Sequence, residues 1–571
     1  MRERQEDTSE EESGNEVSFP TQNVSLPTTE DEPAREQVAD VNESATADEV
    51  SSQSEDQPTE GRSPYGLRSR EVPASINLVE EDDQVYSFVV SGYDDEAIGE
   101  AKKTELESLK RFNTFIEVRD AGQSTVSSKW VITPKTVAGK LQYKARLVCR
   151  GFEENLSATD SPTVDKSNLR LFSALCPTFG WKPKSLDVKS AFLQSEDLDR
   201  EVFVKPPRDV KKANCIWLLK KPLYGLGDSP VNWWFTFSTY LREIGMSISK
   251  LDKALFYLYT NKLEGVLALH VDDCLWAGTT KFHKLMNLVT KKFVISREES
   301  ENMRYLGIDL SLTEDGINLS QRDYVISPLN LESCKGRVNL TESEIKDYQR
   351  VLGKLNWLGC VTRPDLKFDI FLASQKKPPT VKDAKSLNKT VKRVSDMDHL
   401  RYRQLEIQNL RILLYSDASL GNLEDRVKSC KAFVLFLADN KSVSLISWSC
   451  KKIDKVCTST LEAETKALKY GMSYAIALAE QLKELTQLEV PIVCRVDSNQ
   501  LYTTAYTRKM VADPTLRRDI ALIQQNLSEG KITALEWVST KSMLADSLTK
   551  SGANPFALIS VLESGNLPDI S

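Results

Sequence analysis

From residue 95 onwards the chain alternates between apolar spacings typical of helices and spacings typical of strands. A helical spacing begins at Asp95 and runs to Phe115. Two strand-like runs follow at 128–133 and 141–150, joined by a predicted turn at Ala138–Gly139. A second helix is expected over Ser167–Leu175. This first stretch therefore predicts mixed helix and strand.

Two further strands meet at adjacent aspartates. The run 255–259 is expected to pair, through a turn at 261–262, with a strand that ends at His270. Apolar residues flank Asp272 and Asp273 on both sides, which places the two acids at or beside a hairpin turn. Neighbouring carboxylates between buried strands repel unless a cation lies there, whereas the same pair on a surface turn is simply solvated.

Other segments in the first half of the chain carry residues that could form one site with this hairpin. Asp187 closes a short strand just before a predicted helix, and a Gly-rich turn at 225–229 opens an aromatic helix that runs to about Ile244. The run 141–150 carries Lys144 and Arg146, a cationic strand that could hold a triphosphate or form a solvated sheet face. Carboxylates from separate elements that converge on one point are what a two-cation phosphoryl-transfer site requires.

The last third has its own pattern of strands and helices. Strands are expected at 411–417, 432–437, 443–448, 491–497 and 532–538, with a long helix over 459–485 and a last helix that opens at Leu544. Acids end two of these strands, and the order predicts a mixed sheet flanked by helices.

The long helix offers two glutamates with different roles. Glu462 follows Ser459 at the spacing of a capping box, so its carboxylate should reach back to an amide at the helix start. Glu464 lies one turn before Leu468, on the edge of the apolar stripe, and should face the sheet where Asp417 and Asp497 end their strands.

The charge composition of the N-terminal segment differs from that of the rest of the chain. Residues 1–60 hold 18 acidic and three basic side chains, although the net charge of all 571 residues is only -7, so the rest is mildly basic. The N-terminal segment is poor in large apolar residues and is expected to be disordered, with no folded domain before residue 94. The predicted organisation is a disordered acidic segment at 1–93, a first folded region at 94–335, a helical connection at 336–410, a second folded region at 411–550 and a tail at 551–571.

Residue usage excludes several classes of protein. The ten cysteines form no Cys-x-x-Cys pair and there are only three histidines, which disfavours zinc ribbons and fingers. Scattered thiols fit a reducing compartment. No signal peptide and no membrane span is expected, because no uncharged stretch approaches about 18 residues.

Ordered motifs in this sequence resemble the reverse transcriptase of Ty1/copia-type retrotransposon Pol polyproteins. They are Lys129-Trp-Val, Lys144-Ala-Arg-Leu-Val-Cys-Arg-Gly-Phe152, Leu186-Asp-Val-Lys-Ser-Ala-Phe-Leu193, Leu223-Tyr-Gly-Leu, His270-Val-Asp-Asp273, Tyr348-Gln-Arg-Val-Leu-Gly-Lys-Leu-Asn-Trp357 and Thr362-Arg-Pro-Asp365. The resemblance covers most of 97–550. It implies an α+β multidomain protein, a right-hand polymerase with fingers, palm and thumb, followed by a ribonuclease H-like mixed sheet with flanking helices.

The resemblance also implies the parts of a polymerase site. Asp187 and Asp272 would ligate two magnesium ions, or manganese in their place, with Asp273 supporting them; one ion would activate the primer 3′-hydroxyl and the other would hold the triphosphate. Phe192 falls at the position of an aromatic gate that selects deoxynucleotides, the alternative being a core phenylalanine. The residues expected at the incoming nucleotide are Lys144, Arg146, Phe192, Tyr224, Gly225, Ser229 and Pro230.

A second active site is implied in the last third. Asp417, Glu464, Asp497 and Asp546 match the four acids of retroviral-type ribonuclease H, which uses two magnesium ions to hydrolyse the RNA of an RNA–DNA hybrid. The implied partners are an RNA template, a DNA primer, the hybrid and deoxynucleoside triphosphates. The implied compartment is the cytoplasm, including virus-like particles, or the nucleus.

Several positions depart from the family pattern. His270 replaces a tyrosine, and Gly227 with Asp228 replaces Lys and Gln. No histidine lies between Asp497 and Asp546, and 429–432 is bulkier than the glycines of relatives, so that Lys431-Ala432 could crowd the substrate groove. The alternatives to an active enzyme are a decayed or host-adopted copy that binds nucleic acid without catalysis, and an unrelated acid-rich phosphotransferase or nuclease.

Overall fold

The structure is a computed structural model that describes residues 78–79, 95–137, 140–154, 160–423, 427–507 and 511–567. The acidic segment expected at 1–93, apart from 78–79, the turn at Ala138–Gly139 and the end of the C-terminal tail lie outside these residues. All described residues belong to one compact unit, 69–571. None of the helices described is both long enough and apolar enough to span a membrane.

The N-terminal part of the first folded region has a small core of its own, which runs from Leu109 to Leu226. Helix α1 packs on strands whose buried side chains include Trp130 and Leu147. The helix ends at Arg111 rather than Phe115, because Asn113 takes a left-handed backbone conformation (φ 51°) that stops the helix. Phe115 instead starts β2 and stacks on Trp217. The elements are α1 (Asp95–Arg111), β1 (Leu78–Val79), β2 (Phe115–Arg119), β3 (Thr125–Val137), β4 (Lys140–Cys149), β6 (Phe203–Lys205) and β7 (Cys215–Leu219).

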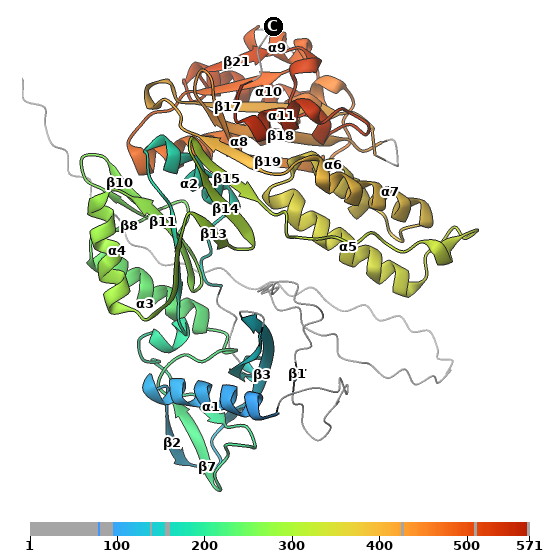
Figure 1. Cartoon of the computed structure of the whole chain (residues 1–571). Coiled ribbons are helices and arrows are strands. Elements are labelled where there is room, and N and C mark those ends of the chain that lie inside the picture. The colour runs from blue at the N-terminus through green and yellow to red at the C-terminus, as the bar shows by residue number, and fades with distance from the viewer. Residues whose placement is uncertain are drawn as a thin grey trace, which may run out of the picture. The chain divides into compact units, whose positions relative to one another are not determined.

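A six-stranded sheet in the order β12-β5-β11-β10-β9-β8 carries the aspartate hairpin (Figure 1). The predicted pairing of 255–259 with the strand ending at His270 is confirmed by β9 and β10. The helix expected after Asp187 is a short 3-10 turn, Ala191–Gln194. The remaining elements are β5 (Lys184–Val188), β8 (Ser247–Ile248), β9 (Leu255–Tyr259), β10 (Leu263–His270), β11 (Asp273–Gly278), β12 (Ile295–Ser300), α2 (Lys166–Thr178), α3 (Ser229–Glu243) and α4 (Thr280–Lys292).

The region expected to be a helical connection contains three helices and ends in a strand. The helices α5 (Glu342–Val361), α6 (Lys367–Ser374) and α7 (Val381–Lys392) share a separate core around Leu355 and Leu387. Strand β16 (Leu400–Arg403) then pairs with β15 in a four-stranded sheet. The other strands of that sheet are β13 (Asn302–Tyr305), β14 (Ile308–Thr313) and β15 (Gly316–Ser320).

The C-terminal region is the mixed sheet that the sequence predicts. Its order is β19-β18-β17-β20-β21, with β20 parallel to both neighbours and the first three strands antiparallel. The helix expected at Leu544 is a 3-10 turn, Asp546–Leu548, because the chain turns again before α11. The elements are β17 (Arg411–Ser419), β18 (Cys430–Ala438), β19 (Val443–Lys452), β20 (Ile492–Val496), β21 (Ala534–Trp537), α8 (Thr460–Thr486), α9 (Asn499–Tyr506), α10 (Pro514–Ser528) and α11 (Phe556–Ser564).

One hydrophobic core runs through the six-stranded sheet, its helices and the C-terminal sheet, from Val164 to Leu562. At the junction, edge strand β19 has a bulge at Ile446, since Leu435 pairs with Ser447 and Phe436 with Leu445. The Ile446 carbonyl accepts a 2.6 Å hydrogen bond from Nε of the buried Arg170 on α2. The two sheets are therefore joined by packing and by polar contacts.

Candidate functional site

The aspartate hairpin turns within two residues. His270 pairs with Asp273, so Val271 and Asp272 form the turn between β10 and β11. Val271 has φ 57°, a conformation that costs a β-branched residue about 1–3 kcal/mol. Its carbonyl accepts a 2.7 Å hydrogen bond from the indole of Trp233, which is buried on α3. The aromatic helix thus holds the turn that presents Asp272, a role of Trp233 that the sequence pattern did not reveal.

Strand β5 brings the third acid to this hairpin. Asp187 lies directly opposite Asp273 in the β5–β11 pair. The amide of Val188 donates a 3.0 Å hydrogen bond to the Asp272 carbonyl, which ties the end of β5 to the turn. Three acids from two elements 85 residues apart therefore meet at one edge of the sheet, as the sequence predicts for Asp187, Asp272 and Asp273.

These acids repel one another in a partly buried place. Burial raises the pKa of Asp272, and Asp187 adds to the shift. The pKa of Asp273 rises to about 7, chiefly through burial and then through Asp272 and Asp187. Arg297 lies opposite Asp187 on β12 and opposes the rise. Because these carboxylates are hard oxygen donors with too little compensating charge, they fit a divalent cation.

The cationic strand β4 approaches the same acids. Burial and the neighbouring Arg146 lower the pKa of Lys144, while Asp187 and Asp272 raise it, so Lys144 lies within electrostatic reach of both. The guanidinium of Arg146 lies over the Tyr224 ring at 5.3 Å, and its Nε is buried without a hydrogen-bond partner. Lys144 therefore borders the aspartate centre electrostatically, and Arg146 keeps one buried donor that has no partner.

Phe192 and Tyr224 form an aromatic pair beside this strand. Their ring centroids are 5.1 Å apart. Burial raises the pKa of Tyr224 to about 12, with Arg146 opposing. The structure therefore brings Arg146, Phe192 and Tyr224 together, and their role at the incoming nucleotide stays a prediction.

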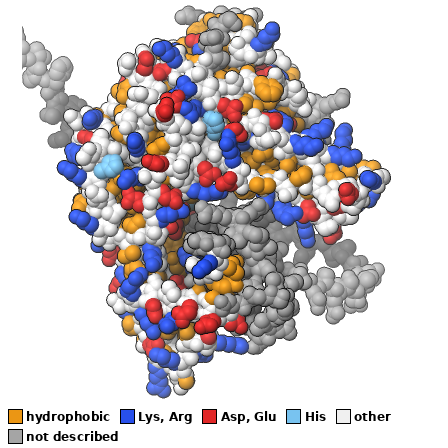
Figure 2. Space-filling model, in the orientation of Figure 1, with side chains coloured by type: hydrophobic (Ala, Val, Ile, Leu, Met, Phe, Trp, Pro, Cys, Tyr) orange, Lys and Arg blue, Asp and Glu red, His pale blue; other side chains and the backbone are white. Residues whose placement is uncertain are grey.

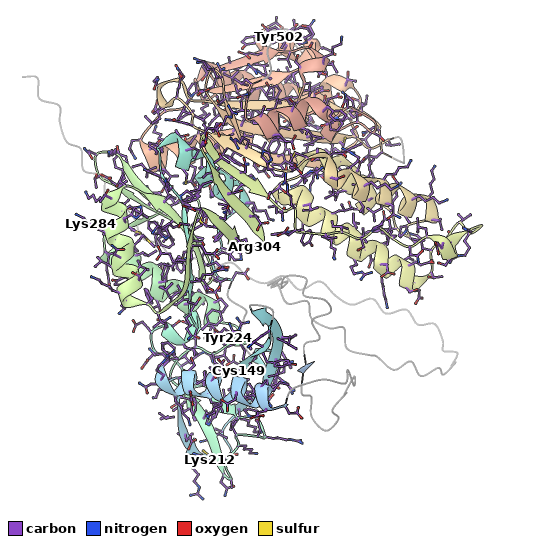
Figure 3. All side chains as sticks on the ribbon, viewed as in Figure 1. Cys149, Lys212, Tyr224, Lys284, Arg304 and Tyr502 are labelled. Carbon is purple, nitrogen blue, oxygen red and sulfur yellow. The ribbon has the colours of Figure 1, made fainter. Side chains whose placement is uncertain are left out.

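The Gly-rich turn is docked on the end of β4. The Cys149 amide donates a 2.7 Å hydrogen bond to the Tyr224 carbonyl, and Figure 3 shows these two residues side by side. Gly225 has φ 91°, and a Cβ atom there would lie 2.0 Å from the Cys149 carbonyl oxygen, so only glycine fits. The buried Ser229 hydroxyl donates to the Leu223 carbonyl at 2.7 Å, and Pro230 lies in the first turn of α3. These contacts hold the Gly-rich turn against the end of β4 and the start of α3, and the predicted place of Gly225, Ser229 and Pro230 at the incoming nucleotide stays a prediction.

The departure at Asp228 has a structural explanation. The Asp228 carboxylate accepts a 2.8 Å hydrogen bond from Arg200, which also pairs with Glu154 at 2.8 Å. Arg200 therefore ties the Gly-rich turn to the segment after β4.

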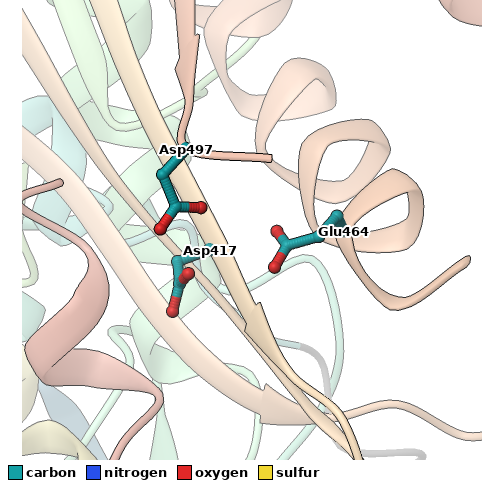
Figure 4. Close-up of side chains that lie close together, drawn as sticks. All are labelled: Asp417, Glu464 and Asp497. Carbon is teal, nitrogen blue, oxygen red and sulfur yellow. The ribbon is translucent and has the colours of Figure 1, made fainter. Parts of the chain in front are cut away.

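The C-terminal sheet presents a second group of acids. Asp417 on β17, Glu464 on α8 and Asp497 after β20 have ligand atoms within 4.8 Å of one another, and Figure 4 shows the three carboxylates converging. Among the described residues, no other three His, Cys, Asp or Glu side chains meet so closely. Glu464 is 8% exposed and its Oε2 atom has no hydrogen-bond partner, so this oxygen is a buried acceptor that a cation could satisfy. This donor set fits a magnesium ion.

The two glutamates of α8 divide as the sequence predicts. The Glu462 carboxylate accepts a 2.8 Å hydrogen bond from the Thr458 amide and pairs with Lys466. The pKa of Glu464 is raised, chiefly by burial and then by Asp417 and Asp497, and burial also raises that of Asp417.

The fourth acid, Asp546, is not one of the three whose ligand atoms converge, but Lys550 links it to Asp417. Its carboxylate forms an ion pair with Lys550, whose Nζ also lies 3.5 Å from Asp417 Oδ1. The Thr549 hydroxyl donates to the other oxygen of Asp417, and Thr540 donates to Asp497 at 3.0 Å. The sequence analysis did not single out Lys550, Thr549 or Thr540, although Thr549 and Lys550 follow Asp546 closely in the run Leu544-Ala-Asp-Ser-Leu-Thr-Lys550.

The bulkier segment before Phe433 has a defined contact. Lys431 Nζ lies 4.5 Å from the centroid of the Tyr470 ring, and Lys451 lies over the same ring at 5.4 Å. Lys431 is therefore directed over α8.

Comparison with known proteins identifies the first half. Residues 113–342 match the family described as "Reverse transcriptase (RNA-dependent DNA polymerase)". The chain is 27% identical over 456 residues to the retrovirus-related Pol polyprotein from transposon RE1 of Arabidopsis thaliana, covering 74% of this chain and 30% of that protein. It is 25% identical to the corresponding polyprotein from transposon TNT 1-94 of Nicotiana tabacum over 530 residues, covering 85% of this chain and 39% of that protein.

More distant similarities extend the comparison. A truncated transposon Ty1-A Gag-Pol polyprotein of Saccharomyces cerevisiae is 24% identical over 509 residues, covering 79% of this chain and 41% of that protein. A solved structure of a foamy viral protease-reverse transcriptase in complex with double-stranded DNA superposes with a TM-score of 0.46 and 13% identity, over 77% of this chain and 69% of that one. The chain spans about a third of the length of the plant polyproteins. Residues 113–342 are therefore a reverse transcriptase region of the Ty1/copia type, and the chain is similar over most of its length to Pol polyproteins of retrotransposons.

Proposed function

We propose that the chain is an RNA-directed DNA polymerase that extends a DNA primer on an RNA template with deoxynucleoside triphosphates. The observation that carries this proposal is the meeting of Asp187 and Asp273 across β5 and β11, with Asp272 on the adjoining turn. Carboxylates in this arrangement are the ligands that phosphoryl transfer by magnesium requires. The proposed organisation is a polymerase with fingers, palm and thumb at 94–335, a helical connection at 336–410 and a ribonuclease H-like region at 411–550.

The chain's own residues would bind and orient the nucleotide. Asp187 and Asp272 would hold magnesium, or manganese, with Asp273 behind them, and the bound metal would supply charge neutralisation at the triphosphate and activation of the primer hydroxyl. Lys144 and Arg146 would bind the triphosphate, since they border the acids with charged donors. Phe192 would exclude a ribose 2′-hydroxyl, held in place by the Tyr224 ring.

A lysine-rich face of α7 supports a nucleic-acid partner. Lys382, Lys385, Lys389 and Lys392 are all exposed and recur at helical spacing. Figure 2 shows Lys and Arg side chains gathered over this helix. Such a stripe would neutralise backbone phosphates without reading sequence.

Primer extension on an RNA template with magnesium tests the polymerase. Wild type should add deoxynucleotides, and Asp272→Ala should reduce extension by at least 100-fold, in line with the loss of a metal ligand. Glu314→Ala, which removes an exposed acid in the turn between β14 and β15, should extend as wild type does. Equal extension by Asp272→Ala and wild type would refute the proposed centre, and no extension by folded wild type would favour a non-catalytic, nucleic-acid-binding copy.

A second activity is favoured by the acid cluster of the C-terminal sheet. We propose that Asp417, Glu464 and Asp497, with Asp546 beside them, hold magnesium for hydrolysis of the RNA strand in an RNA–DNA hybrid. The lowered hydration that raises the pKa of Glu464 and of Asp417 would also strengthen their attraction for a cation.

Hybrid cleavage distinguishes the two centres. Asp497→Ala should abolish cleavage of a labelled RNA–DNA hybrid while primer extension remains within twofold of wild type. Asp272→Ala should do the reverse. Parallel loss of both activities in either variant would mean that the two centres are not independent.

A further inference from the structure

Lys550 places a positive charge between two acids of the proposed ribonuclease centre. Its Nζ forms an ion pair with Asp546 and lies 3.5 Å from Asp417 Oδ1. Asp546 starts the 3-10 turn that shortly precedes Lys550 in the sequence, whereas Asp417 is on the central strand β17. One ammonium group therefore bridges carboxylates from two elements.

The four acids are engaged unequally. Both oxygens of Asp417 already have protein partners, Thr549 Oγ1 on Oδ2 and Lys550 on Oδ1. Glu464 Oε2, in contrast, is buried without a partner and lies in the group with Asp417 and Asp497. A free carboxylate oxygen is therefore available to a metal ion at Glu464, whereas the carboxylate of Asp546 is already paired with Lys550.

The lysine is held by its surroundings rather than loosely placed. The preceding residue, Thr549, is fully buried, and its carbonyl accepts hydrogen bonds from Asn422 at 2.6 Å and from Cys430 at 3.3 Å. The Lys550 side chain is 38% exposed, so its outer part can leave the acids without disturbing that anchor.

We propose that Lys550 is a positioning residue that substitutes for the second cation of this centre. In the protein without nucleic acid, a single divalent ion binds to Asp417, Glu464 and Asp497, while the ammonium of Lys550 neutralises Asp546 and the outer side of Asp417. A second divalent ion binds only after Lys550 leaves Asp546. This inference rests on the proposed ribonuclease function, but it concerns metal binding and can be measured without cleavage.

The test counts manganese ions bound to the full-length chain by electron paramagnetic resonance. An Asp272→Asn, Asp273→Asn background removes ligands of the polymerase centre from the count. In that background we expect one tightly bound Mn²⁺, and with Lys550→Met added we expect a second ion whose dissociation constant falls at least tenfold. Lys550→Arg should retain one ion, because the charge is kept.

A matched control separates a local effect from a change in net charge. Lys541→Met removes an exposed lysine in the preceding 3-10 turn and should leave the count at one. If Lys550→Met unfolds without a cooperative transition, Lys550→Gln is titrated in its place. Two tight ions before any change at Lys550, or an unchanged count and affinity after its neutralisation, would overturn the proposal.

Hybrid cleavage, measured in parallel with an intact polymerase centre, keeps the two proposals apart. A count that rises from one to two without cleavage in any variant supports the role of Lys550 and refutes the ribonuclease. Cleavage by wild type with no change in count refutes the role of Lys550 alone.

Discussion

Replacing Arg170 by methionine should weaken the junction between the two sheets. The guanidinium is 5% exposed and donates to Ile446 at 2.6 Å and to Val361 at 3.2 Å, and it lies over the Trp448 ring at 4.2 Å. Methionine fills a similar volume but leaves those carbonyls without a partner.

The size of the effect depends on two opposing contributions. Two buried carbonyls that lose their donor cost about 1–3 kcal/mol each, and the lost cation–π contact costs about 1–2 kcal/mol. Against this, burial lowers the pKa of Arg170, which means that the protein already destabilises its charge, and replacing a buried charge by an apolar side chain recovers part of that loss. We expect a net decrease of about 3 kcal/mol in the free energy of unfolding.

Urea unfolding of the full chain, followed by tryptophan fluorescence, measures this decrease. Because one core joins the two sheets, wild type should unfold them in a single transition, and Arg170→Met should shift its midpoint downward or split it. Arg350→Met on the exposed face of α5, where Arg350 forms an exposed ion pair with Asp347, should change stability by less than about 0.5 kcal/mol. A decrease below about 1 kcal/mol for Arg170→Met would show that desolvation of the guanidinium cancels its hydrogen bonds.

Three further predictions concern the polymerase half. Val271→Gly should raise the midpoint of thermal unfolding by relieving the positive φ, a gain of about 1 kcal/mol after the added chain entropy of glycine, and an unchanged or lower midpoint would argue against strain there. The pKa of Asp273 is raised to about 7, so the folded state binds this proton more tightly than the unfolded state, in which the pKa is near 4. The resulting contribution to the free energy of unfolding is present below about pH 4 and is lost as the pH rises through 7. Asp273→Asn should therefore be about 2 kcal/mol more stable than wild type at pH 8 in a chelator and equal to it at pH 4 in urea unfolding; equal stability at both values would contradict the assigned repulsion. Lys385→Gln with Lys389→Gln should reduce the slope of log K against log salt for hybrid binding by about 2, and an unchanged slope would exclude this face of α7 from the contact.

Local patterns in the sequence predicted the features that depend on residues close together in the chain, which are turns, strand ends and side-chain directions. The turn at Asp272, the strand end at Asp187 and the different directions of Glu462 and Glu464 follow from strand alternation and helical spacing, and the structure has each of them.

Contacts between distant segments were beyond such patterns. Trp233 reaches Val271, and Lys550 reaches Asp417, only because tertiary packing brings their elements together. The helix predicted to reach Phe115 ended early because one Asn with positive φ outweighed the apolar spacing. Neither the periodicity nor the motifs contained this information.

The bulged edge strand β19 affects how a fragment that contains only the C-terminal sheet would behave. An edge strand offers unpaired backbone groups to any other strand. Here the Ile446 carbonyl accepts from Arg170 and the Leu445 carbonyl from the Tyr402 hydroxyl, while the Trp448 indole donates to the Gly359 carbonyl. A fragment that begins at residue 411 would expose this edge together with an apolar tryptophan. Such a fragment should self-associate. In the full chain, the elements that precede residue 411 prevent this by covering the edge of β19.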